Sequence, residues 1–263
     1  MQKKKVAIVT TIYKETPTVD EKISLNHLYR FLNNYDKYVL VPESSGFQLS
    51  GFKAVQFPKK YFTSAKANAD LLFSKELYQK FIDYDYILIY ELDSLVFSDD
   101  LIFWCEKGYD YIGAPWIKSQ MIKRYDFPDA VGNGGFALRR VESFIKVLEN
   151  GRHPFITIFK ETIKALKTKK TKGLVELIID IWSNTPKRTK MIEDRFWSFK
   201  AKLFMPEFNV APVEEGLKFA FEINPRENYK TIGNKLPFGC HAWARYDRDF
   251  WEPYLIIDDK KIN

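Results

Sequence analysis

A strand–helix–strand pattern at the start of the chain constrains its fold more than any other feature. Residues 6–11 are an unbroken β-favouring run, apolar side chains recur at helical spacing over residues 19–32, and residues 38–42 form a second apolar run. Two strands joined through a helix form a parallel, right-handed crossover. We therefore expect an α/β fold, and similar patterns predict further strands at residues 54–57, 86–90 and 136–138 and a helix over residues 65–81 capped by Ser64.

Composition narrows the class of protein. The 263 residues are 46% hydrophobic and 16% aromatic, which excludes disorder and allows a full core. No run approaches a membrane span, and the short apolar run after the lysines at positions 3–5 is expected to be a strand rather than a signal peptide, which predicts a cytoplasmic protein. The formal charge of +7 favours anionic partners such as sugar nucleotides, phospholipid surfaces or nucleic acid. Because no nucleic-acid-binding motif accompanies the charge, we expect no nucleic acid partner.

The tripeptide Glu91-Leu92-Asp93 directly follows the apolar run at residues 86–90. Since side chains alternate along a strand, Glu91 and Asp93 should lie on one face at its C-terminal end. Two carboxylates this close repel each other unless a cation lies between them, and Mg²⁺ or Mn²⁺ takes oxygen ligands of this kind. A solvated strand end is the alternative interpretation of the same triplet.

Polar residues at the ends of the other predicted strands should share one edge of the sheet with this pair. Ligands of open α/β sheets bind beyond the carboxyl ends of the strands, where we place Thr10, Thr11, Tyr13 and Glu43. Residues 10–14 contain no glycine, so this segment is neither a dinucleotide fingerprint nor a Walker-type loop. Phosphate charge must then be met in another way, for which a metal on the acidic pair is the candidate.

A glycine-rich segment, Gly132-Asn133-Gly134-Gly135, precedes the strand predicted at residues 136–138. Three glycines in four residues carry a large cost in backbone entropy, which favours a loop that a ligand approaches closely. The alternative is a tight hairpin, in which Asn133 is only a turn residue.

Two later segments carry further candidates. Glu193 and Asp194 open an aromatic helical stretch, where a carboxylate is either a general base tuned by burial or a residue that compensates the helix dipole. His241 follows a turn that contains glycine, and a neutral imidazole there would complete the coordination of a metal held by Asp93.

Residues 151–190 differ in character from the rest of the chain, because amphipathic helical stretches are joined there by lysines. We expect this basic helical insertion either to make a peripheral contact with an anionic membrane surface or to be a solvated insertion with a basic face.

Taken in order, the motifs at residues 91–93, 132–136, 193–197 and 239–243 resemble those of the nucleotide-sugar-dependent glycosyltransferases of the GT-A fold. More narrowly, the chain is similar to a bacterial and fungal group of such enzymes linked to surface-polysaccharide biosynthesis. The resemblance implies a mixed, mostly parallel Rossmann-like sheet and a hexosyltransferase-like enzyme that uses Mn²⁺ or Mg²⁺ and a nucleoside-diphosphate sugar, with UDP-linked donors the commonest in the fold. One departure is Glu91, which stands where the common version of the metal motif has Asp.

The resemblance also implies roles for single residues. Asp93 and His241 would be the protein ligands of the metal, with Glu91 near the ribose or the water shell of the metal. Asp194 would deprotonate the acceptor hydroxyl in an inverting reaction, and Glu193 would orient donor or acceptor. The other expected contacts are with the nucleotide or donor sugar (Thr10, Thr11, Tyr13, Glu43, Lys66, Asn68) and with the sugar and acceptor pocket (Asn133, Gly134, Gly135, Phe136, Trp243).

We accordingly expect a single domain over residues 1–263, with a nucleotide-binding half (1–97) and an acceptor and catalytic half (98–263) that carries the insertion at about 151–190. The expected partners are the nucleotide-sugar donor and a glycan or lipid-linked saccharide acceptor, reached at the inner face of the membrane if the insertion binds lipid. Two alternatives stay open: a retaining glycosyltransferase, and a non-catalytic sugar- or nucleotide-binding protein on the same fold.

Overall fold

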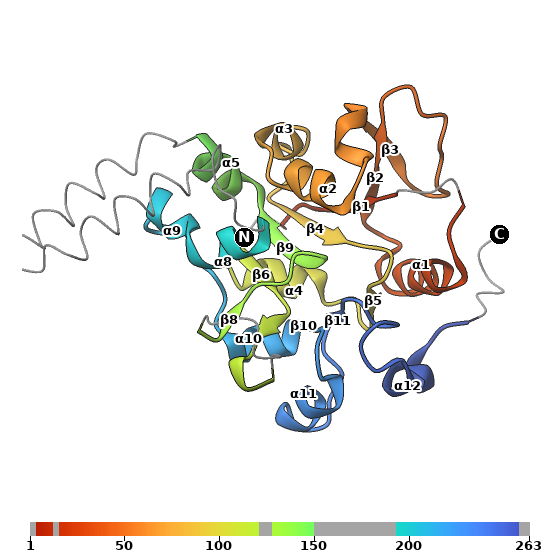
Figure 1. The fold of residues 1–263 in the computed structure, drawn as a ribbon, viewed down its shortest axis with the longest axis vertical. Helices are drawn as coiled ribbons and strands as arrows, with labels where there is room; N and C mark the ends of the chain where they lie inside the picture. Colours follow the sequence, from red (N-terminus) through yellow and green to blue (C-terminus); the bar gives the residue numbers. More distant parts are fainter. Residues whose placement is uncertain (1–3, 13–15, 121–127, 150–192, 258–263) are drawn as a thin grey trace, which may run out of the picture.

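The central feature of the fold is a six-stranded mixed sheet (Figure 1). The computed structural model describes residues 4–12, 16–120, 128–149 and 193–257. The sheet has the strand order β3-β2-β1-β4-β9-β6. Its strands are β1 (Val6–Thr11), β2 (Asp36–Pro42), β3 (Lys53–Phe57), β4 (Tyr86–Tyr90), β6 (Tyr111–Gly113) and β9 (Phe136–Arg140).

The first four strands of this sheet are parallel, and β9 runs antiparallel to both of its neighbours, β4 and β6. Strands β1 and β4 have the predicted bounds, while the other three predicted strands are each extended by one or two residues. The predicted α/β fold with a mixed, mostly parallel sheet flanked by helices is therefore confirmed.

Helices cover both faces of this sheet because its strands are apolar on both sides. Along β1, Ile8 belongs to the same buried cluster as Leu28 of α1, whereas Val9 belongs to a second cluster that includes Leu71 of α2. The helices of the first face are α1 (Val19–Leu32) and α4 (Leu101–Glu106); those of the second are α2 (Ala65–Leu72), α3 (Lys75–Gln79), α5 (Val141–Glu149), α8 (Glu193–Phe199) and α9 (Ala201–Phe204).

The single helix predicted over residues 65–81 is wrong, because two helices occupy the segment. Ser64 caps α2 as expected, since its side chain accepts a hydrogen bond from the Ala67 N–H at 3.1 Å. The first helix ends at Leu72, and the Ser74 side chain accepts from the Leu77 N–H at 3.3 Å to begin α3. A serine inside a helical pattern can therefore act as a second cap and restart the helix.

Two small sheets complete the described part of the fold. One has the order β10-β11-β5, formed by Ala220–Phe221, Gly239–Cys240 and Leu95–Val96, and the other pairs β7 (Pro115–Trp116) with β8 (Ala130–Val131). The tight hairpin considered for the glycine-rich segment is wrong, because β8 pairs with β7 while β9 pairs with β4 and β6. The remaining elements are α10 (Val213–Phe219), α11 (Pro225–Thr231), α12 (Arg248–Trp251) and the 3₁₀ helices η1 (Lys59–Phe62), η2 (Lys118–Gln120) and η3 (Glu252–Tyr254).

Within the described ranges, no helix has both the length and the apolar character needed to cross a membrane. Tyr13 and the basic insertion at residues 151–190, to which a nucleotide contact and a membrane contact were assigned, lie outside the described residues.

Candidate functional site

The C-terminal ends of the parallel strands meet at one edge of the large sheet. Because β1, β2 and β4 are parallel, Thr11, Glu43 and Glu91 all lie at this edge. Strand β9 begins at the same edge, since Phe136 pairs with Tyr90 in the antiparallel register. The glycine-rich loop of residues 132–135 therefore arrives beside the acidic pair, and the Glu91 N–H donates to the Gly135 carbonyl at 2.8 Å.

Local backbone pairing explains why Asp93 and His241 meet although they are far apart in the sequence. After β4 the chain turns, with the Ser94 N–H donating to the Glu91 carbonyl at 2.9 Å, and then enters β5. Strand β5 pairs antiparallel with β11, with Leu95 opposite Cys240. The segment that precedes β5, with Asp93, and the segment that follows β11, with His241, are thereby brought together, and the Trp243 N–H donates to the Asp93 carbonyl at 3.1 Å.

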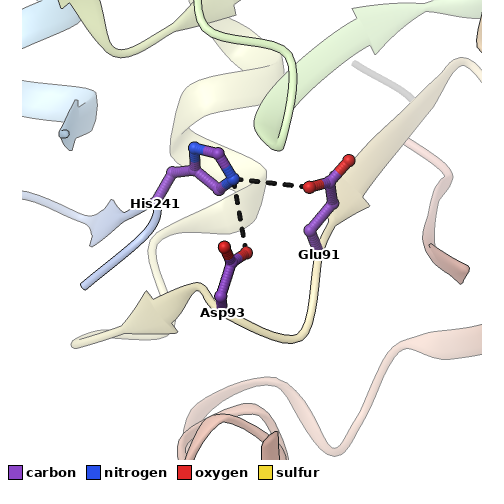
Figure 2. Close-up of side chains that lie close together, drawn as sticks. All are labelled: Glu91, Asp93 and His241. Carbon is purple, nitrogen blue, oxygen red and sulfur yellow. Dashed lines mark ion pairs between the residues drawn. The ribbon is translucent and has the colours of Figure 1, made fainter. Parts of the chain in front are cut away.

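Figure 2 shows the resulting cluster of two carboxylates and one imidazole. His241 Nε2 lies 3.3 Å from Asp93 Oδ1 and 3.4 Å from Glu91 Oε2. One ligand atom from each of the three residues lies within 4.8 Å of the others. Nε2 is buried and forms no hydrogen bond with any residue in the described ranges. A buried imidazole nitrogen without a hydrogen bond, facing two carboxylate oxygens, fits a divalent cation with mixed oxygen and nitrogen ligands.

The charges of this cluster also favour a cation. Burial lowers the pKa of His241, but the neighbouring carboxylates of Asp93, Glu222 and Glu91 outweigh burial and raise this pKa well above its usual range. Burial raises the pKa of Asp93, yet His241 and the charge of Arg245 lower it overall. The carboxylates around His241 therefore favour a positive charge between them, either as a proton on His241 or as a metal ion that displaces that proton.

Glu222, which the sequence analysis missed, is the third carboxylate beside His241. It directly follows β10, which runs parallel to β11, and its Oε1 lies 3.2 Å from His241 Nδ1. The signal that could have found Glu222 is the apolar pair Ala220-Phe221 that precedes it, which repeats the strand-then-acid pattern of residues 86–91 at smaller scale.

The glycine-rich loop separates this cluster from the Glu193–Asp194 pair. A Cβ added at Gly135 would overlap the His241 ring at Nε2, so only glycine allows the ring to occupy this place. A Cβ added at Gly134 would lie 3.2 Å from Glu193 Oε2 and 3.4 Å from the Asp194 Cβ. Consecutive residues of one loop therefore contact the two candidate groups, and all four motifs come together at this edge of the sheet.

The Gly135→Ala substitution should displace the His241 ring from its two carboxylate neighbours, so we expect the variant to lose the Mn²⁺ binding that this cluster would support. The matched control is Gly46→Ala, because a Cβ at Gly46 meets nothing within 4 Å. Isothermal titration with Mn²⁺ measures the effect, and circular dichroism checks that both variants are folded. Equal Mn²⁺ affinity in the two folded variants would contradict a role of the His241 ring position in metal binding.

Glu193 is held by Arg139 of β9, a second residue that the sequence analysis missed. Arg139 donates from Nη1 to Glu193 Oε1 at 2.7 Å, and the two side chains are 0% and 6% exposed. The guanidinium also donates to the Tyr78 hydroxyl at 2.9 Å and to the Gly134 carbonyl at 3.2 Å. Glu193 is therefore tied to the glycine-rich loop through a buried ion pair.

Asp194 occupies the first turn of α8, where its Oδ1 accepts a hydrogen bond from the Arg195 N–H at 2.7 Å. Burial and the nearby charge of Glu193 raise the pKa of Asp194 to about 7. The hydrogen bond from Arg195 opposes this rise, and the charge of Glu222 adds to it. A carboxylate that takes up and releases a proton near neutral pH is suited to general acid–base chemistry.

The other predicted contact residues divide between buried and exposed positions. Thr10 and Asn68 are buried, and Thr10 Oγ1 and Asn68 Oδ1 have no hydrogen-bond partner among the residues described. Thr11 is buried at the end of β1, while Lys66 and Glu43 are exposed. The unsatisfied side-chain oxygens of Thr10 and Asn68 leave these two residues available for a polar contact with a ligand.

Three of the predicted pocket residues have their side chains engaged within the protein. The rings of Phe136 and Trp243 are 0% exposed, and Arg248 stacks over Trp243 with its guanidinium carbon 4.7 Å from the ring centroid. Asn133 is 6% exposed, and both of its polar atoms form hydrogen bonds, to the Gly135 N–H and to Glu222. These three side chains therefore support the shape of the site through contacts within the protein.

Several solved structures are similar in overall fold. They include the glycosyltransferase GlyE of Streptococcus pneumoniae TIGR4 (14% identity, TM-score 0.47, covering 97% of this chain and 61% of that one). A second is a glycosyltransferase involved in the glycosylation of the major capsid of PBCV-1 (10% identity, TM-score 0.49, covering 95% of this chain and 98% of that one). A third is the galactosyltransferase LgtC in complex with donor and acceptor sugar analogs (12% identity, TM-score 0.47, covering 97% of this chain and 98% of that one). This chain thus spans about three-fifths of the GlyE chain.

No curated protein has a significantly similar sequence. A family model described as "Protein of unknown function (DUF5672)" matches residues 51–241, which include the acidic pair, the glycine-rich loop, Glu193, Asp194 and His241. Because this match covers most of the chain, the protein belongs to the DUF5672 family.

Proposed function

We propose that this protein is a metal-dependent glycosyltransferase that moves a sugar from a nucleoside-diphosphate sugar, UDP-linked in the first instance, to a hydroxyl of a glycan or lipid-linked acceptor. The observation that carries the proposal is the meeting of the Glu91, Asp93 and His241 cluster with Asp194 across two consecutive glycines at the ligand-binding edge of the sheet. The order of the four motifs, which resembles that of GT-A glycosyltransferases, gives this arrangement its proposed chemistry.

In this proposal Asp93 and His241 hold the divalent cation, and Glu91 holds its water shell or the donor ribose. When bound, the cation stabilises the negative charge that builds on the departing nucleoside diphosphate. Asp194 accepts the proton of the acceptor hydroxyl, which makes that oxygen a better nucleophile, and inversion at the sugar carbon follows from attack on the face opposite the leaving group. The Arg139–Glu193 ion pair holds the glycine-rich loop beside both groups.

The proposal is tested by isothermal titration with UDP and with GDP, each with and without Mn²⁺, on the wild type and on Asp93→Ala. We expect metal-dependent binding of one nucleotide, abolished by the substitution because a cluster ligand is removed. Asp83→Ala is the control, since Asp83 is an exposed carboxylate that precedes the opposite end of β4. The nucleotide that binds then selects the sugar donors for an assay of nucleotide release.

If neither nucleotide binds in any condition, the proposal of a UDP- or GDP-sugar transferase is contradicted and another class of donor is favoured. Metal-dependent binding without turnover of any donor would instead favour the non-catalytic sugar- or nucleotide-binding alternative. The anomeric configuration of the product separates inversion from retention.

A further inference from the structure

Glu222 connects the candidate metal ligands with the glycine-rich loop through a single oxygen atom. Its Oε1 lies 3.2 Å from His241 Nδ1 and accepts a hydrogen bond from Asn133 Nδ2 at 2.8 Å. The Glu222 side chain is only 12% exposed, so these two groups take the place of water as its partners. Contacts from two directions fix the position of this carboxylate.

The bond to Glu222 determines which nitrogen of His241 is left for a cation. A carboxylate accepts hydrogen bonds, so the His241 nitrogen that faces Glu222 carries the proton and donates it. The lone pair of the neutral ring then lies on Nε2, the nitrogen that faces Asp93 and Glu91. Carboxylates that hold a metal-binding histidine in this way orient the ring and raise its basicity.

Asn133 links Glu222 to the glycine-rich loop. Asn133 donates to Glu222 with its amide nitrogen and accepts from the Gly135 N–H with its Oδ1 at 3.0 Å. Gly135 in turn packs against the His241 ring so closely that a Cβ would overlap it. The His241 ring is thus held at Nδ1 by Glu222 and against Gly135 by a loop that Glu222 also anchors.

We propose that Glu222 is a positioning residue that orients His241 Nε2 toward a divalent cation and fixes the glycine-rich loop against the imidazole ring. This inference rests on the metal site of the proposed function. It adds a residue outside the motifs that suggested that function, and it makes the loop and the metal site one structural unit.

Binding of Mn²⁺ alone and Mn²⁺ with UDP, followed by the electron paramagnetic resonance signal of free Mn²⁺, tests this role without any turnover. Glu222→Ala should weaken Mn²⁺ binding by about 10–100-fold, the usual cost of losing a carboxylate behind a ligating histidine. Glu222→Gln keeps an acceptor oxygen and should lose less. The control is Glu215→Ala on α10, since Glu215 has a similar exposure of 15% but pairs with Lys107 and Lys218.

A double-mutant cycle with His241→Ala separates positioning from a general structural role. If Glu222 acts through His241, then Glu222→Ala weakens Mn²⁺ binding no further once the imidazole is gone. If the alanine variant fails to fold, Glu222→Gln replaces it in the cycle, and its smaller loss should likewise vanish in the His241→Ala background.

The outcomes distinguish this inference from the proposed function. Wild-type binding of Mn²⁺ that Glu222→Ala leaves unchanged, or additive losses in the cycle, would overturn the role of Glu222 and leave the metal site standing. No wild-type binding of Mn²⁺, with or without UDP, would overturn the metal site and the role of Glu222 together.

Discussion

The Asp194→Asn variant should lose about 10²–10⁴-fold in kcat, the range that a positioned general base contributes. Asparagine has nearly the same shape and can still accept the Arg195 N–H bond, so the loop and the helix start should be preserved. It cannot take the proton of an acceptor hydroxyl. Mn²⁺ and nucleotide binding, which we propose to depend on the cluster on the other side of the glycine-rich loop, should stay at the wild-type level.

The pH dependence of kcat/KM reports on the same carboxylate. Burial and the charge of Glu193 raise the pKa of Asp194 to about 7, and a base acts only in its ionised form. The rate of the wild type should therefore fall about tenfold per pH unit below pH 7 and level off above it. In Asp194→Asn this limb of the profile should disappear, because the group that titrates is gone.

Asp249→Asn is the matched control for the alternative role of Asp194 in compensating a helix dipole. Asp249 is an exposed carboxylate in the first turn of α12, so its loss should leave kcat unchanged. If Asp194→Asn also retains the wild-type kcat and only its free energy of unfolding falls, by about 1 kcal/mol, then Asp194 compensates the dipole of α8. The proposed inverting mechanism would then have no general base.

Five of the six strands of the large sheet could be predicted because long apolar runs have few other stable arrangements, whereas the three-residue β6 was not predicted. The bounds of β1 and β4 follow directly from their sequences. The two-residue strands β5, β10 and β11 leave no periodic signal of their own, and their pairing depends on packing between distant segments. These short strands are nevertheless the ones that bring Asp93, Glu222 and His241 together.

The candidate ligands could be predicted from their chemistry, whereas the residues behind them could not be predicted from motifs. Glu222 follows only the two-residue apolar run Ala220-Phe221, which is too short to predict a strand by itself, and its neighbours become apparent only in three dimensions. Arg139 did leave a signal, because alternation along β9 places it on the same face as the buried Ala137. A charged residue on a core-facing position of a strand requires a buried partner of opposite charge, and Glu193 is that partner.

Arg139→Met should destabilise the fold by about 3–5 kcal/mol, the cost of leaving one member of a buried ion pair without its partner. Methionine fills much of the same space, so the loss comes from Glu193, from Tyr78 and from the Gly134 carbonyl, which all lose a donor. Urea unfolding measures the change in free energy. The matched control is Arg226→Met, because Arg226 forms a bidentate pair with Asp247 while 57% exposed, and the loss of such a surface pair should change the stability far less.

Two further measurements identify the unpaired Glu193 charge as the cause of the Arg139→Met loss. Adding Glu193→Gln to Arg139→Met removes the buried charge and should recover part of the stability. The loss should also shrink at low pH. Burial raises the pKa of Glu193 in the folded state above its usual value, so the folded variant takes up a proton more readily than the unfolded chain. The stability that this proton gives is present at low pH and is lost as the pH rises and the carboxyl must ionise. If neither Glu193→Gln nor low pH reduces the loss of stability, the loss comes from the packing of the arginine side chain and not from its charge. The ion pair would then position the glycine-rich loop without stabilising the core.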